Sequence, residues 1–354
     1  MTHSTLKTLA ILTVRNEAAF LLEWVAHHKA VGFTDFLIFS NDCTDGTDAM
    51  LDRLQDMGLV THHRNDGPYD KGGIQFTALK QASKLDQTKT ADWILPLDVD
   101  EFVNIHTGDG TLPALFAALP VATAITLTWR LFGSSDQVRY SDVPMTQGFT
   151  KCAPVDLPWP WRSAMFKTLY RNDGTYGKVG VHRPRDPDKS RLDAARWFDG
   201  EGRELDDQFK TRRIFSNFGR SNHALVQLNH YAVGSMESYV LKADRGRAVH
   251  SDHMLDVDYW VDRNFNTETD TSIQRMAARS DPVLEQLKAD PTLSRLHTKA
   301  VNWRRNRFEK LMLNEPYRAL FGRLLMTPPT RALSPRAAGM LVRFAQKGRS
   351  KPQD

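Results

Sequence analysis

Apolar residues are distributed along the first 130 residues in two alternating patterns. Continuous apolar runs of strand length, as expected for strands buried on both faces of a sheet, occur at Leu9–Val14, Phe36–Phe39, Trp93–Leu97 and Ala124–Trp129. A shorter strand is predicted near Leu59–His63. Apolar residues at helical spacing predict helices over Phe20–Val31, Met50–Met57 and Gln75–Leu85. Strands alternating with helices of this length predict a doubly wound α/β fold with a mostly parallel sheet flanked by helices.

The rest of the chain has a weaker pattern. From Leu131 to Arg220, prolines, tryptophans and charges mix without a clear period, which is typical of ordered loops that carry recognition. Helices are predicted further on, over Met236–Ala248, Ser272–Leu287 and Val301–Leu313. We therefore expect a main domain over residues 1–250, a helical extension over 251–326 and a basic, loosely ordered tail over 327–354.

Composition narrows the setting of the protein. Cys43 and Cys152 are the only cysteines among 354 residues, which favours a reducing compartment. Residues 1–10 lack the pattern of a secretory leader, and no apolar run reaches the roughly 20 residues of a membrane helix. We therefore expect a cytoplasmic protein, either free or peripheral at the inner face of the membrane. The formal charge of +5 suits anionic ligands, and it equally suits a solubilising surface.

Three carboxylates directly follow the predicted strand Trp93–Leu97, at Asp98, Asp100 and Glu101. Ligands of open parallel sheets bind beyond the carboxyl ends of the strands. Asp98 and Asp100 lie on the same side of an extended backbone, where a hard cation such as Mg²⁺ or Mn²⁺ would relieve their repulsion and hold a diphosphate. The alternative is a solvated acidic turn. Because the string follows a buried strand, we favour metal or nucleotide binding.

Polar residues also follow the first two predicted strands. Thr13–Glu17 ends the first strand and opens a helix, where Arg15 and backbone N–H groups could meet an anion. Asn16 could equally cap that helix. The segment Ser40–Thr47 ends the second strand, and its short side chains could contact a base or ribose or simply form the turn. Three polar strand ends at one edge of a sheet favour a binding site there.

These segments resemble a known family. Thr13–Glu17, Asn41–Thr47 and Leu97–Phe102 resemble the family 2-type glycosyltransferases of the GT-A fold, in particular the subgroup with D-x-D-E-F at its metal site. Leu228–Tyr231, followed by Ser235–Tyr239, Lys242 and Arg245-Gly246, resembles the C-terminal motif of family 92-like glycosyltransferases. The resemblance implies a metal-dependent, inverting transferase of surface glycan or polysaccharide synthesis. It would move a sugar from a nucleotide sugar, with UDP favoured, to a glycan or lipid-linked acceptor.

The resemblance also implies roles for individual residues. Residues 1–130 would bind the nucleotide sugar, and 131–250 would shape the acceptor site. The nucleotide contacts would come from Thr13, Arg15, Asn16, Glu17, Asn41, Asp42, Lys71, Gln75 and Asp98. Asp98 and Asp100 would hold Mn²⁺ or Mg²⁺, completed by a histidine, either His230 or His182. The family usually has an Asp pair where this chain has Asn41-Asp42, so the choice between UDP and GDP stays open.

An inverting transferase needs a base for the acceptor hydroxyl. The candidates are Glu237, Asp206 and Asp207, although Glu237 could instead form a salt bridge on its predicted helix. A further set of residues, the tryptophans of the middle region and its borders, could stack on sugar rings or pack in the core: Trp129, Trp159, Trp161 and Trp197.

The last part of the chain, from Tyr317 to Lys351, combines eight Arg and Lys residues with several large apolar ones. A basic amphipathic segment could contact anionic lipid, which would suit a lipid-linked acceptor. A solvated tail is the alternative.

Other classes of protein fit the sequence less well. A haloacid-dehalogenase-like phosphatase would use Asp98 as its nucleophile, but its motif normally lies on the first strand and continues differently. A non-catalytic carbohydrate-binding protein is also compatible with the chain. We expect no nucleic-acid partner, because the acidic strand end would repel a phosphate backbone. No G-x-G-x-x-G follows the first strand, which disfavours a Rossmann oxidoreductase.

Overall fold

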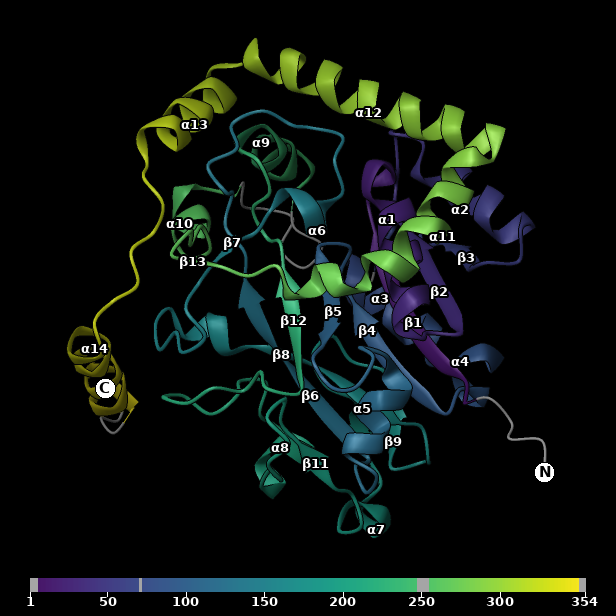
Figure 1. Cartoon of the computed structure of the whole chain (residues 1–354), viewed down its shortest axis with the longest axis vertical. Coiled ribbons are helices and arrows are strands. Elements are labelled where there is room, and N and C mark those ends of the chain that lie inside the picture. Colours follow the sequence, from purple (N-terminus) through teal and green to yellow (C-terminus); the bar gives the residue numbers. More distant parts are fainter. Residues whose placement is uncertain (1–5, 70–71, 247–254, 350–354) are drawn as a thin grey trace.

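The computed structural model describes residues 6–69, 72–246 and 255–349, and the structural statements below refer to these residues. A nine-stranded sheet forms the centre of the molecule, in the order β3-β2-β1-β4-β8-β6-β12-β5 with β11 paired to β6 (Figure 1). Its strands are β1 Thr8–Val14, β2 Asp35–Ser40, β3 Thr61–Arg64, β4 Trp93–Leu97, β5 Glu101–Ile105, β6 Ala124–Leu131, β8 Phe166–Arg171, β11 Trp197–Phe198 and β12 Val226–His230. Two short ribbons pair β7 Lys151–Cys152 with β13 Glu268–Thr269, and β9 Tyr176–Lys178 with β10 Arg185–Pro187.

The central sheet is mostly parallel. Strands β3, β2, β1 and β4 run parallel to one another, as do β12 and β6 and also β11 and β6. Strand β8 is antiparallel to both of its neighbours, and β5 is antiparallel to β12. The predicted α/β class with a mostly parallel sheet flanked by helices is therefore confirmed. The boundary predicted near residue 130, between a nucleotide-sugar half and an acceptor half, does not divide the sheet. Strand β8, which follows this boundary in the sequence, lies between β4 and β6.

Helices surround the sheet and extend the C-terminal part of the chain. They are α1 Ala18–Val31, α2 Thr47–Asp56, α3 Ile74–Ala82, α4 Asp86–Thr90, α5 Leu112–Ala118, α6 Met145–Gly148, α7 Lys189–Leu192, α8 Asp207–Thr211, α9 Met236–Arg245, α10 Val257–Val261, α11 Ala277–Ala289, α12 Pro291–Met312, α13 Glu315–Met326 and α14 Pro335–Arg349. Two 3₁₀ turns lie at Trp161–Ala164 and Ser272–Met276. None of the described helices is long and apolar enough to cross a membrane.

The apolar pattern of the first half explains its elements. Strand β1 is almost wholly buried, and α1 ends at Gly32, whose φ of 115° is left-handed and suits a residue without Cβ. Helix α1 packs against α11 and α12 of the helical extension (Figure 1). Helix α12 begins at Pro291, ten residues before the predicted start, because Asp290 caps it by accepting from the N–H groups of Thr292 and Leu293.

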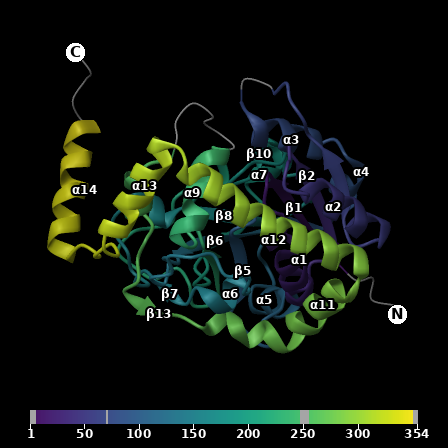
Figure 2. The ribbon, with the colours of Figure 1, turned by 90° about the horizontal axis from the view of Figure 1, so that it is seen from above.

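Several parts of the structure differ from the sequence prediction. Four strands of the central sheet were not predicted: β5 directly after the acidic string, β8 and β11 inside the segment without a period, and β12. Strand β8 carries Lys167 at a fully buried position, which interrupts the apolar run by which a buried strand is recognised. The tail, expected to be loosely ordered, contains helix α14, which lies to one side of the main body (Figure 2).

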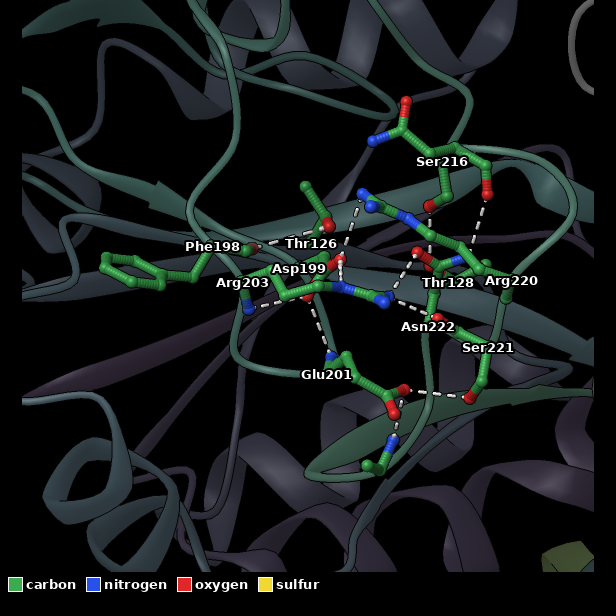
Figure 3. A network of polar contacts seen from close by, with 12 residues as sticks. Thr126, Thr128, Phe198, Asp199, Glu201, Arg203, Ser216, Arg220, Ser221 and Asn222 are labelled. Carbon is green, nitrogen blue, oxygen red and sulfur yellow. Dashed lines mark hydrogen bonds and ion pairs between the residues drawn. The ribbon is translucent and has the colours of Figure 1, made fainter.

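Polar contacts order the segment from Asp199 to His223 (Figure 3). The Asp199 carboxylate is 1% exposed and accepts hydrogen bonds from the backbone and the guanidinium of Arg203 at 2.9 Å. The hydroxyls of Thr128 and Ser216 lie 2.6 Å apart, which ties this segment to β6. Bonds of this kind are invisible to hydrophobic periodicity, so the sequence predicted only loops here.

Candidate active site

A cavity of about 430 Å³ opens at the carboxyl ends of β1, β2 and β4. Eight of the residues predicted for the site line it: Thr13, Arg15, Asn41, Gln75, Asp98, Asp100, His182 and His230. The rest of the wall includes Trp129 on β6, residues 162–181, the end of α9 and residues 255–263. The sheet topology thus brings these segments, distant in sequence, to one place, as expected for an open α/β sheet.

The first two strand ends are held together by side-chain amides. The Asn41 side chain is 1% exposed and donates to the carbonyl of Val14 at 2.7 Å, so it fastens β2 to the end of β1. Its Oδ1 accepts from Asn65 Nδ2 at 2.6 Å. Asn16 has a left-handed φ of 53°, and its Oδ1 accepts from the N–H of Thr44 at 2.7 Å. These amides fix the strand ends beside the cavity, and of the three only Asn41 lines it.

Asp98 belongs to a cluster of charges under the cavity. One carboxylate oxygen accepts from Gln75 Nε2 at 2.9 Å and the other from Lys167 Nζ at 3.0 Å. Lys167 also lies 3.4 Å from Glu101, which is completely buried and accepts from the indole N–H of Trp129 at 2.6 Å. Burial and the neighbouring carboxylates Asp98 and Asp100 raise the pKa of Glu101, while Lys167 and the backbone N–H of Asp98 oppose that rise. We call Asp98, Glu101 and Lys167 the closed cluster.

Asp100 lies in a different arrangement two residues further on. Its Oδ2 accepts from Lys242 Nζ at 2.7 Å, and its Oδ1 lies 3.8 Å from His230 Nε2. Burial alone would raise the pKa of Asp100, but the charge of Lys242 and the nearby His230 hold it well below its usual range. Burial lowers the pKa of His230 to about 3, so its imidazole is neutral at physiological pH. We call Asp100, His230 and Lys242 the open cluster.

Two aromatic groups connect the open cluster with the opposite wall. The Trp129 ring lies 4.2 Å from the ring of His230 and 5.8 Å from that of His182. His182 Nδ1 lies 3.0 Å from the carbonyl oxygen of Phe166, which can only accept a hydrogen bond. Nδ1 therefore carries the proton, and Nε2 keeps a lone pair. Burial, together with the charge of Lys167, lowers the pKa of His182 to about 4.

The cavity carries an excess of positive charge. Its cationic lining residues, against the two carboxylates Asp98 and Asp100, are Arg15, Arg162, Lys242, Arg245 and Arg263. The Nε atoms of Arg15 and Arg263 and Nδ1 of His230 are buried without a hydrogen-bond partner in the described part of the chain. Buried polar groups are almost always satisfied, so such atoms in a cavity point to a polar, anionic ligand.

Several predicted residues lie outside this cavity. Asp207 is 90% exposed on α8 and pairs with Lys210 at 2.8 Å, so its position does not support a role as base. Asp206 caps the same helix by accepting from the N–H of Gln208. Glu237 accepts from the N–H of Tyr140 at 2.9 Å and is likewise absent from the cavity wall. The structure therefore brings neither Glu237 nor Asp207 to the wall of this cavity.

The remaining predicted residues lie beside the cavity. Glu17 is ion-paired with Arg245 and sits 3.5 Å from Arg304, where it supports the wall from behind. Asn16 and Asp42 line a neighbouring groove of about 450 Å³ that shares Arg15 and Arg245 with the cavity. Lys71 lies outside the described residues. Of the tryptophans, Trp129 lines the cavity, whereas Trp197 is fully buried in the core.

Sequence reasoning missed Lys167, Arg162 and Arg263. Lys167 and Arg162 belong to the segment without a period, and nothing local distinguishes them from surface charges. Arg263 is 5% exposed and stacks on Tyr259 at 3.7 Å, a contact that depends on how α10 packs. The pairing of Asp100 with Lys242 spans 142 residues and had only the resemblance as a signal.

The described part of the protein supplies too few ligands here to enclose a metal ion by itself. The residues fit an ion that is also held by phosphate oxygens of a bound ligand and by water. Among the residues that the structure describes, no group of three or more His, Cys, Asp or Glu is placed to hold a metal ion. Asp98 is occupied by Gln75 and Lys167, whereas Asp100 Oδ1 and His230 Nε2 face each other across 3.8 Å. One carboxylate and one imidazole suit a Mg²⁺ or Mn²⁺ ion whose other ligands are phosphate oxygens and water.

Comparison with known proteins adds a family similarity. The model of glycosyltransferase family 92 matches residues 9–152, which include the first three polar strand ends of the cavity. A family 92 protein of Oryza sativa subsp. japonica is 25% identical over 143 residues, covering 39% of this chain and 23% of that protein. One of Ricinus communis is 30% identical over 98 residues, covering 27% and 16%. Residues 9–152 are thus similar to proteins named as family 92 glycosyltransferases.

The matched region is limited. It covers less than a quarter of the length of these curated relatives and ends before Leu228–Gly246, where the sequence motif resembled family 92. Among solved structures, S. aureus TarS 1–349 has 14% identity over 88% of this chain and 92% of that one, with a TM-score of 0.30. A putative glucose-1-phosphate thymidylyltransferase from Bacillus anthracis, solved with a sucrose, has 12% identity over 47% and 72%, with a TM-score of 0.26. The fold assignment rests on the sheet topology, because TM-scores this low do not support it.

Proposed function

We propose that this protein is a glycosyltransferase that moves a sugar from a nucleotide-diphosphate sugar, with UDP favoured, onto an acceptor hydroxyl. The observation that carries the proposal is the cavity at the ends of β1, β2 and β4. It has five cationic side chains against two carboxylates and leaves two arginine Nε atoms without partners. Such a wall suits a nucleoside diphosphate. The family 92 similarity over residues 9–152 supports the same class of reaction.

The nucleotide end of the donor would lie against β1 and β2, near Thr13, Arg15 and Asn41, and the diphosphate near the open cluster. When the sugar–phosphate bond breaks, negative charge grows on the leaving diphosphate. Lys242 and Arg263 stabilise that charge where it develops. A divalent cation between Asp100 and His230, when bound, would add Lewis-acid stabilisation of the same oxygens. The ion would lie at the D-x-D-E-F string, where the resemblance implies a metal site, but with Asp100 alone as its carboxylate ligand instead of Asp98 and Asp100 together.

The base of an inverting reaction is best assigned to His182. Its Nε2 has a lone pair by the tautomer argument, it lines the cavity, and its ring neighbours Trp129, on which a sugar would rest. The acceptor oxygen would form its bond to the anomeric carbon as His182 Nε2 takes the hydroxyl proton and the diphosphate leaves. This replaces Glu237 and Asp207, which do not reach the cavity.

The phosphatase alternative is less well supported. A nucleophilic aspartate needs a free oxygen aimed at the phosphorus atom, but both oxygens of Asp98 accept hydrogen bonds from protein side chains.

The proposed acceptor is a glycan or a lipid-linked sugar in surface glycan synthesis, as the resemblance implies. A protein that binds carbohydrate without turning it over would share the cavity but release no nucleoside diphosphate.

The first test is calorimetric titration with UDP, GDP and their sugars, with and without Mn²⁺, for the wild type and Asp100→Asn. We expect metal-enhanced binding of one nucleoside diphosphate, weakened at least about tenfold in the variant because one ligand and the partner of Lys242 are altered. Asp207→Asn is the control and should bind as the wild type does. If no nucleotide binds under any metal condition, the proposal fails.

The base assignment has its own test. His182→Gln should lower kcat by about 10²–10⁴-fold while nucleotide-sugar binding is retained. His223→Gln is the matched control, since burial also lowers the pKa of His223 to about 4 and its Nε2 contacts the carbonyl of Trp129, outside the cavity. A His182→Gln enzyme with the turnover of the control would show that another group takes the proton.

A further inference from the structure

The C-terminal part of the chain exposes an unusual number of large apolar side chains. Of the 14 such side chains among the described residues, seven lie between residues 313 and 344. They are Leu313, Leu325, Met326, Leu333, Met340, Val342 and Phe344. Met326 is 77% exposed and Phe344 63%. Single exposed apolar residues are ordinary, but a concentration of them in one short segment marks an interaction surface.

The same segment is strongly basic. Residues 327–349 contain Arg331, Arg336, Arg343, Lys347 and Arg349 and no aspartate or glutamate. Positions 336, 343 and 347 share one flank of α14 at helical spacing, and positions 340 and 344 lie on the adjoining flank. A basic flank beside an exposed apolar flank is the pattern of a helix that lies in the plane of a membrane surface.

Residues 327–334 connect α13 to α14, and we call this segment the arm. The arm is attached to the main part of the molecule. The backbone N–H of Thr330 donates to the carbonyl of Asn264 at 2.7 Å, and the Thr330 hydroxyl donates to the carbonyl of Val261. Val261 ends α10, which packs against α13. Helices α13 and α14 lie on the same side of the molecule in both views (Figures 1 and 2). These contacts fix the arm to the end of α10 at Thr330, five residues before α14 begins.

We propose that α14, with the arm that precedes it, is a docking surface for an anionic lipid bilayer. The cationic flank attracts the lipid headgroups, and Met340 and Phe344 enter the acyl boundary. Nucleic acid would satisfy only the charges and would leave the apolar flank in water, so lipid is the occupant that explains both features. This inference is independent of the reaction proposed above, and its test measures no catalysis.

The test is co-sedimentation of the full chain with vesicles of phosphatidylcholine alone or with about 30% phosphatidylglycerol, at low and high salt. We expect binding only to the anionic vesicles and its loss at high salt. Arg336→Glu/Arg343→Glu should lower the partition coefficient at least about tenfold, since each basic residue near the surface contributes severalfold. Lys84→Glu/Lys189→Glu is the matched control, because it makes the same charge change at exposed positions on α7 and before α4.

A second variant separates lipid from other occupants. Met340→Ser/Phe344→Ser keeps all the charges and should still weaken vesicle binding about tenfold through lost apolar burial. The inference is overturned if the wild type does not sediment with anionic vesicles at low salt, or if both α14 variants sediment like the control. It is also overturned if the apolar variant binds vesicles as the wild type does, because the site would then recognise only negative charge, as a site for RNA would. The same holds if sedimentation velocity shows that this flank joins two copies of the chain.

Discussion

The three carboxylates that follow β4 belong to one five-residue string, yet they form two charged clusters that are built in opposite ways. In the closed cluster, Lys167 lies within 3.4 Å of both Asp98 and Glu101, and every carboxylate oxygen accepts a hydrogen bond from a protein group. In the open cluster, Lys242 occupies one oxygen of Asp100, and the other faces His230 across 3.8 Å. The closed cluster is internally satisfied, whereas the open one presents unused polar atoms to the cavity.

This difference separates support from binding. A buried charge whose partners are all protein groups is expensive to disturb but has nothing left to offer a ligand. A cluster with unsatisfied atoms is cheaper to alter and is completed by what binds there. We therefore expect changes in the closed cluster to act mainly on stability, and changes in the open cluster mainly on donor binding and turnover.

The largest expected effect is on the closed cluster. Lys167→Met keeps the length of the buried side chain but leaves Asp98 and Glu101 close together without a cation. Removing one partner of a buried ion pair costs about 3–5 kcal/mol, so the free energy of unfolding in urea should fall by that amount. Lys242→Met, the matched change in the open cluster, should cost clearly less. Equal losses in the two variants would remove the distinction between the clusters.

The second effect is catalytic. Asp100→Asn should reduce kcat/KM by about 10²–10³-fold, the size found when one group that stabilises transition-state charge is removed. Its urea midpoint should stay near that of the wild type, because Lys242 keeps the carbonyl of Ala232 as an acceptor at 2.6 Å. A variant that loses stability as much as Lys167→Met would place Asp100 with the supporting groups instead.

The third effect concerns Trp129, which touches both clusters. Its indole donates to Glu101, and its ring packs on His230. Trp129→Phe removes a hydrogen bond to a buried carboxylate and should cost about 1.5–3 kcal/mol of stability. The remaining phenyl ring should retain most of the sugar binding. Calorimetry with the donor and urea unfolding of the same sample would separate the two roles.

The fourth prediction tests what lies behind the turn that both clusters share. The indole of Trp24 donates to the carbonyls of Asp98 and Glu101 at 3.2 Å, and His27 Nε2 contacts the carbonyl of Val103 at 2.8 Å. Burial lowers the pKa of His27 to about 4. The unfolded chain binds a proton there below about pH 6.5, while the folded protein does not. The stability contributed by neutral His27 is therefore complete above pH 6.5 and is lost as the pH falls toward 4.

At pH 5 the deficit from His27 should be about 2 kcal/mol, since 1.5 pH units lie below its unfolded pKa and each is worth about 1.36 kcal/mol. His27→Gln keeps a donor for the carbonyl of Val103 and cannot be protonated. Its free energy of unfolding should consequently fall less between pH 7 and pH 5 than that of the wild type. Parallel pH profiles for the two proteins would mean that His27 is solvated in the folded state.

The polar residues at the ends of β1 and β4 could be predicted from the sequence, whereas Lys167 and its ion pairs in the closed cluster could not. The reason is physical. The runs Leu9–Val14 and Trp93–Leu97 are apolar and contiguous, so their strands and the polar residues after them could be placed from local pattern alone. Lys167 sits in a strand whose burial depends on neighbours that precede it by about 70 residues in β4 and by about 40 in β6. No local signal marks a buried lysine, so neither the strand nor its ion pairs could be read from periodicity.

The same reasoning applies to the base. Glu237 and Asp207 were chosen from the sequence as candidate carboxylate bases, but the direction of a side chain depends on how its helix is capped and packed. Glu237 is turned toward the backbone of Tyr140, and Asp207 toward Lys210. The tautomer of His182 is fixed by the carbonyl of Phe166, a contact made only when β8 and the segment after it are in place.

The smallest expected effect is at Asp207, which belongs to neither cluster. Its side chain is 90% exposed and pairs with Lys210, which lies three residues further along the five-residue helix α8. Exposed pairs of this kind contribute about 0–1 kcal/mol, so Asp207→Asn should change neither kcat nor the urea midpoint measurably. A loss of turnover without a loss of nucleotide binding would mean that α8 moves to the cavity when the acceptor binds. Residues of α8 would then belong to the active site together with the closed and open clusters.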